Sequence, residues 1–200
     1  MMGSFFTRED FCALSDEGQP VVSPFDPEAV QPASVDLKLG NAQYSYTLKT
    51  YVLGQELQSD AVEEREFDRL DIRPHTTVFI GLQETIAIPR HALGLVLPRS
   101  SVTRLGICIS PVYMNPGYTG QMPITVVNNS PFSVEVVPGV RVAQLLCFHL
   151  GAEPARSYAD YEEAKYRNEK VSPSLMHSDR EISDVIKSIL KQHAPSIMRN

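Results

Sequence analysis

The sequence predicts a mainly β protein, built as a sandwich or barrel, on three observations. Fifteen prolines and eleven glycines interrupt its 200 residues at short intervals. The intervals are rich in Val, Ile, Thr, Tyr and Phe, which favour strands. Helical spacing of apolar residues is confined to the two ends of the chain. This alternation of short strands and turns is typical of a β domain.

Nine strands are expected, and two of them indicate how they are buried. Residues 133–137 alternate polar and apolar side chains, as a half-buried strand does. Residues 140–148 are almost continuously apolar and predict a central strand. The charged run at 63–66 is expected to be a solvated loop. The expected strands are 34–39, 44–53, 76–82, 84–88, 93–97, 107–110, 121–128, 132–137 and 141–150.

Helical signals lie at the two ends of the chain. Residues 7–10 (TRED) form a capping pattern that opens a short helix, with Phe11 and Leu14 on one face. Residues 178–181 (SDRE) have the capping-box spacing. Apolar residues then recur at helical spacing at Ile182, Val185, Ile186, Ile189 and Leu190. We expect this apolar face to pack on the chain's own domain or on a neighbouring subunit.

The chain is expected to have three parts. Residues 1–150 form the β-barrel core, residues 151–179 form a polar irregular tail, and residues 180–194 form the C-terminal amphipathic helix. The tail carries aromatic and basic residues but no apolar run. The tail is therefore not expected to fold as a second domain. It is expected to adopt a defined structure only through its contacts with another part of the assembly or with a ligand.

Charge and missing motifs exclude several classes of function. The formal net charge is −6 and no basic run is present, so nucleic-acid binding is not expected. No apolar stretch is long enough to cross a membrane, and residues 1–4 lack the parts of a signal peptide. The chain has no P-loop, no dinucleotide-binding glycine pattern, no nucleophile elbow and no zinc-deaminase signature.

The three cysteines, Cys12, Cys108 and Cys147, predict neither a disulfide framework nor a zinc site. None belongs to a CxxC pair or has a histidine at metal-ligand spacing. Cys108 and Cys147 lie in apolar runs and are expected to be buried as small hydrophobic side chains. Free thiols suit a reducing compartment, so a cytoplasmic location is expected.

The most informative segments are two turns in the middle of the chain. Residues 97–106 (LPRSSVTRLG) contain an Arg-Ser-Ser turn before an expected strand, and residues 115–120 (NPGYTG) form a second turn after it. Three more segments accompany them: residues 31–40 (QPASVDLKLG), 138–145 (PGVRVAQL), and the tail from Tyr158 to residues 165–169 (KYRNE). In this order, over roughly residues 5–175, the segments resemble the trimeric dCTP deaminase and dUTPase superfamily, and its dCTP deaminase branch in particular.

The residue types in these turns suit a triphosphate ligand. Arg99, the hydroxyl groups of Ser100 and Ser101, and backbone amides of turns such as the one at Gly117 can donate hydrogen bonds to phosphate without a large basic patch. In isolation, an Arg-Ser-Ser turn is also a common capped turn, and Arg104 is a common surface charge.

The resemblance implies a distorted jelly-roll-like β-barrel and a role for each residue of the site. It implies that Ser100 and Arg104 lie near the reacting pyrimidine and water. It implies that Tyr118 stacks under deoxyribose and excludes a 2′-hydroxyl. The residues that it implies for phosphate binding and closure of the tail are Arg99, Ser101, Gln144, Tyr158, Lys165 and Glu169.

Two departures from the family pattern affect the chemistry. The family's deaminases have a catalytic Glu where this chain has Thr125, and a hydroxyl group cannot move protons near neutral pH as that carboxylate does. The superfamily's diphosphatases have an Asp where this chain has Asn115, which can bind a sugar hydroxyl but cannot accept a proton.

Three further positions bear on the site. Glu169 stands where the tail usually has a Gln, and a carboxylate beside a triphosphate is repulsive unless a cation intervenes. The segment between residues 106 and 115, which frames the base, is shorter than in the deaminases. Asp36 is expected to be a structural hydrogen-bonding carboxylate. The scaffold and sugar pocket are therefore expected to be intact while the chemistry is altered.

The resemblance also implies partners and a cofactor. Neighbouring subunits of a homotrimer would build each site, and the tail would contribute over it. Mg²⁺ would bind through the triphosphate oxygens of the nucleotide, not in a protein cage, and no zinc is expected.

Three functions remain open on the sequence. The first is a dCTP deaminase-like hydrolase that converts dCTP and water into dUTP and ammonia. The second is a dUTP diphosphatase or a hydrolase of another deoxynucleoside triphosphate. The third is a non-catalytic nucleotide-binding trimer with a regulatory role, which would explain why Thr125 and Asn115 replace both carboxylates.

Overall fold

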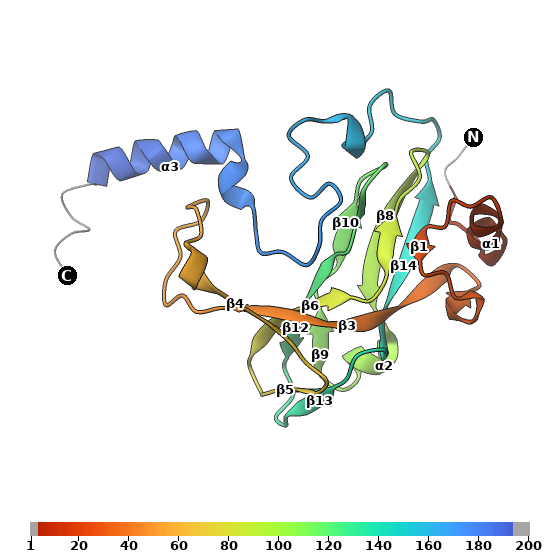
Figure 1. The fold of residues 1–200 in the computed structure, drawn as a ribbon, viewed down its shortest axis with the longest axis horizontal. Helices are drawn as coiled ribbons and strands as arrows, with labels where there is room; N and C mark the ends of the chain where they lie inside the picture. Colours follow the sequence, from red (N-terminus) through yellow and green to blue (C-terminus); the bar gives the residue numbers. More distant parts are fainter. Residues whose placement is uncertain (1–3, 194–200) are drawn as a thin grey trace. The chain divides into compact units, whose positions relative to one another are not determined.

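The computed structural model describes residues 4–193, in which strands dominate (Figure 1). These residues form two compact units. The first extends to Tyr44 and resumes over Glu64–Ser172, and the second contains Ser45–Glu63 and residues from Pro173 onward. Residues 1–3 and residue 194, the predicted end of the C-terminal helix, lie outside the described residues.

A nine-stranded, largely antiparallel sheet forms the framework. Its strand order is β10-β8-β14-β3-β6-β12-β9, and β2 and β4 also pair with β3. Register shifts within β3 and β14 bend the sheet into a curled half-barrel. The predicted mainly β, jelly-roll-like fold is therefore confirmed. The strands are β2 Val30–Gln31, β3 Ser34–Tyr46, β4 Val62–Glu66, β6 Thr77–Leu82, β8 Ala92–Pro98, β9 Ile107–Ile109, β10 Val112–Met114, β12 Pro123–Asn128 and β14 Arg141–His149.

Two small sheets and three α-helices complete the described chain. One small sheet joins β1 Val22–Ser23, β7 Thr85–Ala87 and β11 Thr119–Gly120, and the other joins β5 Leu70–Ile72 and β13 Val134–Val136. The α-helices are α1 Arg8–Asp16, α2 Ser100–Thr103 and α3 Arg180–His193. Short 3₁₀ turns lie at Pro27–Ala29, Ser59–Ala61, Tyr158–Asp160 and Met176–Ser178.

The core of the first unit consists of the alternating apolar side chains of the sheet. Along β12, Ile124 and Val126 are buried, while Thr125 between them is partly exposed. Leu37, Ile80 and Leu145 from neighbouring strands have no exposed surface. Each such side chain contributes about 1.5–3 kcal/mol by leaving water, so the alternating pattern fixes which face of each strand points inward.

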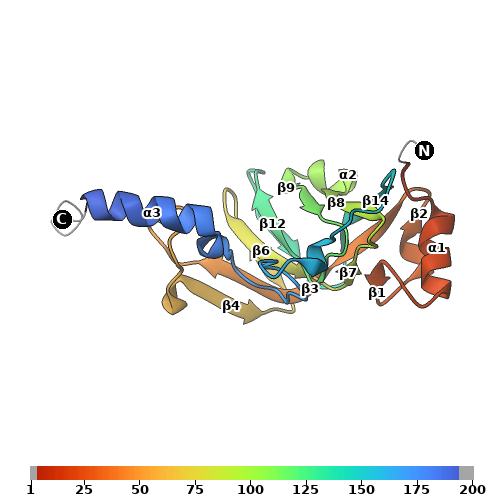
Figure 2. The same cartoon turned by 90° about the horizontal axis from the view of Figure 1, so that it is seen from above.

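Helix α1 begins as its capping pattern predicts. The Asp10 carboxylate accepts hydrogen bonds from the Thr7 backbone N–H at 2.7 Å and from the Thr7 hydroxyl at 3.0 Å. Phe11 is buried, and its ring centroid lies 5.4 Å from that of Phe6. The Arg8 guanidinium donates to the carbonyl of Val30, which ties α1 to β2 (Figure 2).

The chain after Tyr46 differs from the prediction. The strand expected over residues 44–53 ends with β3 at Tyr46, because Thr47 then donates its N–H to Ala61 and its hydroxyl to Asp60 instead of extending the ladder. The charged run at 63–66 belongs to strand β4, so its prediction as a loop was wrong. Its side chains are solvent-exposed as expected, and a strand at the edge of the sheet that is exposed on both faces tolerates them.

One local prediction was also wrong. Cys108 is exposed, because it alternates with buried Ile107 and Ile109 on strand β9, whereas Cys147 is buried as expected. In the segment with capping-box spacing, residues 178–181, Ser178 lies in a 3₁₀ turn before α3. Its hydroxyl donates to the Leu175 carbonyl at 2.7 Å.

The second unit contains α3, whose side chains are described only in part. Val185 and Ile189 are exposed on this helix within the chain. The side chains of Ile186 and Leu190, which complete the predicted apolar face, lie outside the described residues. Across residues 4–193, the helices are too short or too polar to span a bilayer.

A buried amide supports the loop that follows β12. Asn128 has no exposed surface, and its Nδ2 donates to the carbonyls of Ile72 and Phe132, both at 2.8 Å. Its Oδ1 accepts from the N–H and the hydroxyl of Ser130. The next residue, Asn129, donates its backbone N–H to the Gly106 carbonyl, so the loop supports the segment that follows α2.

We predict that Asn128→Ala lowers the free energy of unfolding by about 3 kcal/mol, because it leaves buried carbonyl and N–H groups without partners. Urea unfolding measures the effect. Asn129→Ala is the matched control, since Asn129 is exposed. Equal stability of the two variants would contradict the structural role of the Asn128 amide.

Candidate functional site

The Arg-Ser-Ser segment forms the start of α2, directly after β8. Arg99 precedes the helix in an extended conformation and donates its backbone N–H to Val142 on β14 at 2.9 Å. The side chains of Ser100 and Ser101 on this short helix and of Arg104 directly after it are exposed. The segment therefore presents two hydroxyl groups and a guanidinium group to solvent from a position fixed by β14.

A buried carboxylate lies behind this helix. Asp36 on β3 is 2 % exposed, and its Oδ1 lies 3.5 Å from Nε of Arg99. Its Oδ2 lies 3.8 Å from Nη1 of Arg141 and has no hydrogen-bond partner among the described residues. Because a buried carboxylate requires compensating positive charge, Asp36 holds both guanidinium groups near this end of the sheet. Gln144 lies opposite Asp36 and Leu97 in the strand register, so it belongs to the same region.

The turn at residues 115–120 is closed by its own backbone. The Tyr118 N–H donates to the Asn115 carbonyl at 3.0 Å, and Gly117 between them has φ +79°. A positive φ after proline is typical of a type II turn and favours glycine. Gly117 also donates its N–H to Ile88, which fixes the turn to the end of β7. Asn115 is exposed, whereas the Tyr118 side chain is buried.

The tail packs against this turn within the first unit. Tyr158 donates its N–H to Pro116, Asn168 donates to Thr119, and Gln121 donates to Glu169, each at 2.7 Å. Tyr158 also accepts a hydrogen bond on its hydroxyl from the Tyr166 N–H at 2.9 Å. The ammonium group of Lys165 lies 5.7 Å from the Tyr166 ring centroid.

An ion pair and a capped turn hold the start of the tail, and sequence reasoning missed both. Arg90 contacts both carboxylate oxygens of Asp160 at 2.7 and 3.1 Å, and this guanidinium keeps the pKa of Asp160 well below its usual range. Asp160 also accepts from the N–H and hydroxyl of Ser157, which is buried. The Ser-x-x-Asp spacing at 157–160 was the signal for this turn in the sequence.

The Tyr118 hydroxyl joins the turn to the tail. It donates to Oε1 of Glu169 at 2.5 Å. Burial raises the pKa of Glu169, and the bond from Tyr118 opposes that rise. Burial, together with the nearby carboxylate, also raises the pKa of Tyr118, so the phenol remains protonated.

The predicted site residues therefore form two clusters within one chain. The α2 cluster contains Arg99, Ser100, Ser101, Arg104 and Gln144. The turn cluster contains Asn115, Gly117, Tyr118, Tyr158, Lys165 and Glu169. Met114 pairs with Gly94 near the start of β8, while Arg99 follows its last residue, so the clusters lie at opposite ends of this strand (Figure 1). At about 3.3 Å per residue, the five residue steps from Gly94 to Arg99 span about 17 Å.

Thr125 lies on β12, which pairs with β6 and β9 and not with β8, so it belongs to neither cluster. It pairs with Phe79 on β6, and its carbonyl accepts from the Ser110 N–H at 3.1 Å. The Phe79 ring stacks on Tyr44 with centroids 4.6 Å apart. The Thr125 side chain is partly exposed on the face opposite to buried Ile124.

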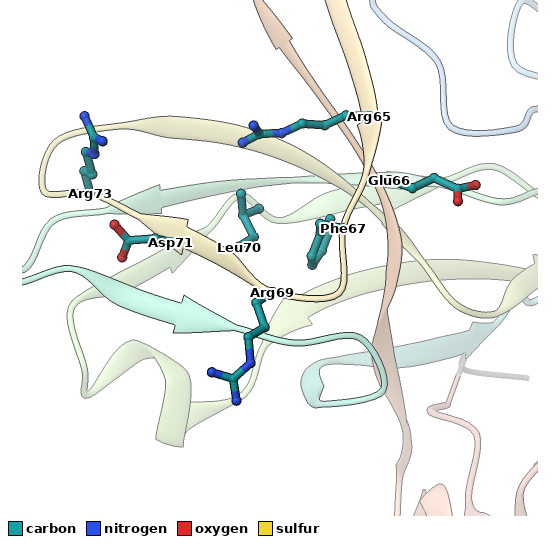
Figure 3. Close-up of a pocket in the computed structure, with 7 residues that line it drawn as sticks. All are labelled: Arg65, Glu66, Phe67, Arg69, Leu70, Asp71 and Arg73. Carbon is teal, nitrogen blue, oxygen red and sulfur yellow. The ribbon is translucent and has the colours of Figure 1, made fainter.

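A separate polar pocket of about 470 Å³ lies between β4 and β5 (Figure 3). Its lining residues are Arg65, Glu66, Phe67, Arg69, Leu70, Asp71 and Arg73. Arg69 also contacts Glu135 at 3.1 Å. No predicted site residue lines this pocket. Within residues 4–193, no group of three or more His, Cys, Asp or Glu side chains is placed to hold a metal ion.

Glu84 is a buried acid that no sequence pattern singled out. It is 5 % exposed, and its Oε2 accepts a hydrogen bond from the Lys38 backbone N–H at 3.0 Å. Burial raises the pKa of Glu84, while this bond and the positive charges of Lys38 and Arg141 oppose the rise. The ionised form of Glu84 is therefore less favourable in the folded protein than in water.

Comparison with known proteins identifies the family. Residues 5–150 match the family model described as dCTP deaminase-like. A dCTP deaminase of the dUMP-forming kind from Methanopyrus kandleri is 33% identical over 176 residues, which cover 82% of this chain and 91% of the relative. A dCTP deaminase from Haloarcula marismortui is 32% identical over 184 residues, which cover 86% and 94%.

A solved structure agrees at the level of the fold. The 2′-deoxycytidine 5′-triphosphate deaminase from Agrobacterium tumefaciens superposes with a TM-score of 0.60 at 21% identity, covering 74% of this chain. This chain spans about half of that longer one, 49% of its length. Given the matched residues and the identities, the chain belongs to the dCTP deaminase-like family.

We predict that Glu84→Gln increases stability at neutral pH relative to the unsubstituted chain. Because the folded-state pKa of Glu84 is raised, its protonated form contributes stability below the unfolded-state pKa. That contribution is lost as pH rises through the folded-state pKa. The stability of Glu84→Gln relative to the unsubstituted chain should therefore increase as the pH rises above about 4.5. Melting temperatures from pH 4 to 8 measure it, with exposed Glu63→Gln as the control. A pH-independent difference would contradict the assignment.

Proposed function

We propose that this chain is a hydrolase of pyrimidine deoxynucleotides that converts dCTP and water into dUTP and ammonia. Family membership along most of the chain carries the proposal, because similar relatives are named dCTP deaminases. In this reaction the water oxygen bonds to C4 of cytosine and the C4–N bond breaks. The amino group leaves as ammonia, with its added proton supplied by the attacking water.

In this proposal, the α2 cluster binds the phosphates and the reacting base. Arg99, Ser101 and Gln144 donate hydrogen bonds to phosphate oxygens. Ser100 and Arg104 hold the pyrimidine and the attacking water. The contact of Arg99 with buried Asp36 supports this role, since it limits the orientations of the guanidinium group before a ligand arrives. Mg²⁺ would be held by the triphosphate oxygens of the nucleotide, which are ligands that it prefers.

The turn cluster binds the sugar and closes the site. Asn115 bonds the 3′-hydroxyl, the backbone of Gly117 shapes the turn, and the Tyr118 ring lies under the deoxyribose. Tyr158 and Lys165 approach the phosphates from the tail. The backbone hydrogen bonds between tail and turn support this arrangement, because they join the tail to the 115–120 turn.

We also propose that two neighbouring copies in a homotrimer build each site. The separation of the two clusters by the length of β8 supports this proposal. A single ligand that contacts both clusters would then lie between α2 of one copy and the turn of another.

Proton transfer is the step for which this chain differs most from the family pattern. Thr125 replaces the carboxylate that would carry a proton from water to the leaving ammonia, and the pKa of a hydroxyl group is too high for that role. General acid–base groups typically contribute about 10²–10⁴ in rate. We therefore propose slow deamination, with binding and orientation supplying most of the rate enhancement.

A second candidate function is dUMP formation, in which water also attacks the α-phosphorus and pyrophosphate leaves. The names of two relatives favour it, since the proteins from Methanopyrus kandleri and Aquifex aeolicus are both called dUMP-forming. The second of these is 31% identical over 172 residues.

The full chain should release ammonia from dCTP in the presence of Mg²⁺. Ammonia, dUTP, dUMP and pyrophosphate are measured separately. Ammonia with dUTP supports deamination alone, and ammonia with dUMP and pyrophosphate supports the second candidate. Tight dCTP binding by calorimetry without any product would overturn both enzymatic functions and identify a binding protein.

Two variants test the missing carboxylate. Thr125→Glu should raise the rate of ammonia release by about 10²-fold or more, because it supplies a proton carrier at this position. Thr125→Val keeps the branched shape on β12 and should leave the slow rate unchanged. A Thr125→Glu variant that binds dCTP but gains no rate would show that Thr125 does not occupy the catalytic position.

Mixed trimers test whether two copies build the site. Arg104→Ala removes a group from the α2 cluster, and Asn115→Ala removes one from the turn cluster, so each variant alone should be inactive. Random mixing of the two variants should restore about one quarter of the sites. Each restored site combines the intact α2 cluster of an Asn115→Ala copy with the intact turn cluster of an Arg104→Ala copy. Activity in the co-expressed mixture, with sedimentation as a trimer, supports the shared site. A trimeric mixture as inactive as its parents would contradict it.

A further inference from the structure

The contact between Tyr118 and Glu169 joins two segments that are 51 residues apart in the sequence. Tyr118 belongs to the turn that follows Asn115, and Glu169 belongs to the tail. Tyr118 is 5 % exposed, and Glu169 is half-buried. A hydrogen bond to a carboxylate in such a site is worth more than one in water, because few solvent molecules compete for it.

Gly120 makes room for this contact. A Cβ atom at Gly120 would lie 2.8 Å from Cγ of Glu169 and 2.8 Å from the Tyr118 hydroxyl oxygen, which is closer than real Cβ contacts. The same residue forms a parallel β-bridge with Glu169. A side chain at residue 120 would therefore have to displace Glu169 or Tyr118, so glycine at this position suits the close approach of the tail to the turn.

The charge of Glu169 favours Tyr118 as its partner over a phosphate group. A carboxylate that faced a triphosphate would be repelled, whereas here Oε1 of Glu169 accepts a hydrogen bond from the Tyr118 hydroxyl at 2.5 Å. Burial opposes ionisation of Glu169, and the hydrogen bond from Tyr118 offsets part of that cost. The carboxylate thus has a stabilising partner in the absence of nucleotide.

We propose that Glu169 is a positioning residue: it holds the Tyr118 ring in place and thereby fastens the tail to the 115–120 turn before any nucleotide binds. The backbone bonds from Asn168 to Thr119 and from Gln121 to Glu169 align the tail, and the side-chain bond locks this alignment. The inference rests on the proposed function in one respect, namely that Tyr118 faces the sugar. Glu169 would then act on sugar selection through Tyr118, without contacting the phosphates.

Hydrogen exchange of residues 157–172 in nucleotide-free full chain tests the fastening. Tyr118→Phe keeps the ring and removes the hydroxyl, and Glu169→Ala removes the acceptor. Each single variant should increase the rate of hydrogen exchange in the tail about tenfold. The double variant should exchange no faster than either single variant, because both substitutions remove the same contact. Glu169→Gln retains an acceptor oxygen and should largely restore protection. The matched control is Glu163→Gln, an exposed carboxylate of the same tail.

Exchange in Tyr118→Phe and Glu169→Ala no faster than in the control would overturn the proposal, as would additive effects in the double variant. Thermal melting identifies any variant that fails to fold. Tyr118→Phe, which changes one atom, keeps the test decisive if Glu169→Ala does not fold.

Sugar selection gives a readout that a purely structural contact would not change. The ratio of CTP to dCTP dissociation constants should fall in Tyr118→Phe and Glu169→Ala and recover in Glu169→Gln, while the control keeps the original ratio. An unchanged ratio despite a loosened tail would overturn the role of Glu169 in sugar selection. If the unsubstituted chain binds neither nucleotide, the proposed function fails, whereas the exchange experiment still decides whether Glu169 fastens the tail.

Discussion

The arrangement of the whole site depends on the length of one strand. β8 lies between β10 and β14 in the large sheet, and its two ends lie beside the two segments that carry most of the candidate chemistry. A strand in a packed sheet cannot shorten or bend appreciably, because its hydrogen bonds to β10 and β14 fix every residue. The distance between α2 and the turn is thus a rigid property of the fold, and no side-chain rearrangement can remove it.

Different forces hold the two ends in place. At the α2 end, one buried carboxylate lies among guanidinium groups, so charge compensation in a poorly solvated region fixes the arrangement. At the turn end, backbone hydrogen bonds and a phenol–carboxylate contact connect the tail to the turn. The first arrangement is built into the sheet, whereas the second depends on a tail that contains little regular structure.

The sequence was informative where a pattern is local. Strands β12 and β14 were predicted because their apolar residues follow a clear order, and the Thr7–Asp10 cap predicted α1 because it needs only four residues. Strands β1, β2, β10 and β11 have two or three residues each and leave no periodicity to detect. Cys108 was misjudged because its apolar neighbours suggest burial, while alternation on β9 decides which side it faces.

For the candidate site, motif order predicted the residues of α2 and of the turn but not their contacts. Arg90 meets Asp160 across 70 residues of sequence. No local sequence pattern predicts this ion pair, because the two residues meet only after the tail has folded against the turn. Likewise, the expectation for Glu169 came from its position in a motif, and its contact with Tyr118 is visible only in three dimensions.

The ends of the large sheet have a consequence for association with foreign chains. The strand path terminates at β10 and at β9, and each of these has only three residues. Short terminal strands offer few unpaired N–H and C=O groups, so they are poor templates for the edge-to-edge growth that begins fibrils. A protein with so many β-strands would otherwise be exposed to that hazard, and here the shortness of these two terminal strands limits it at both ends of the path.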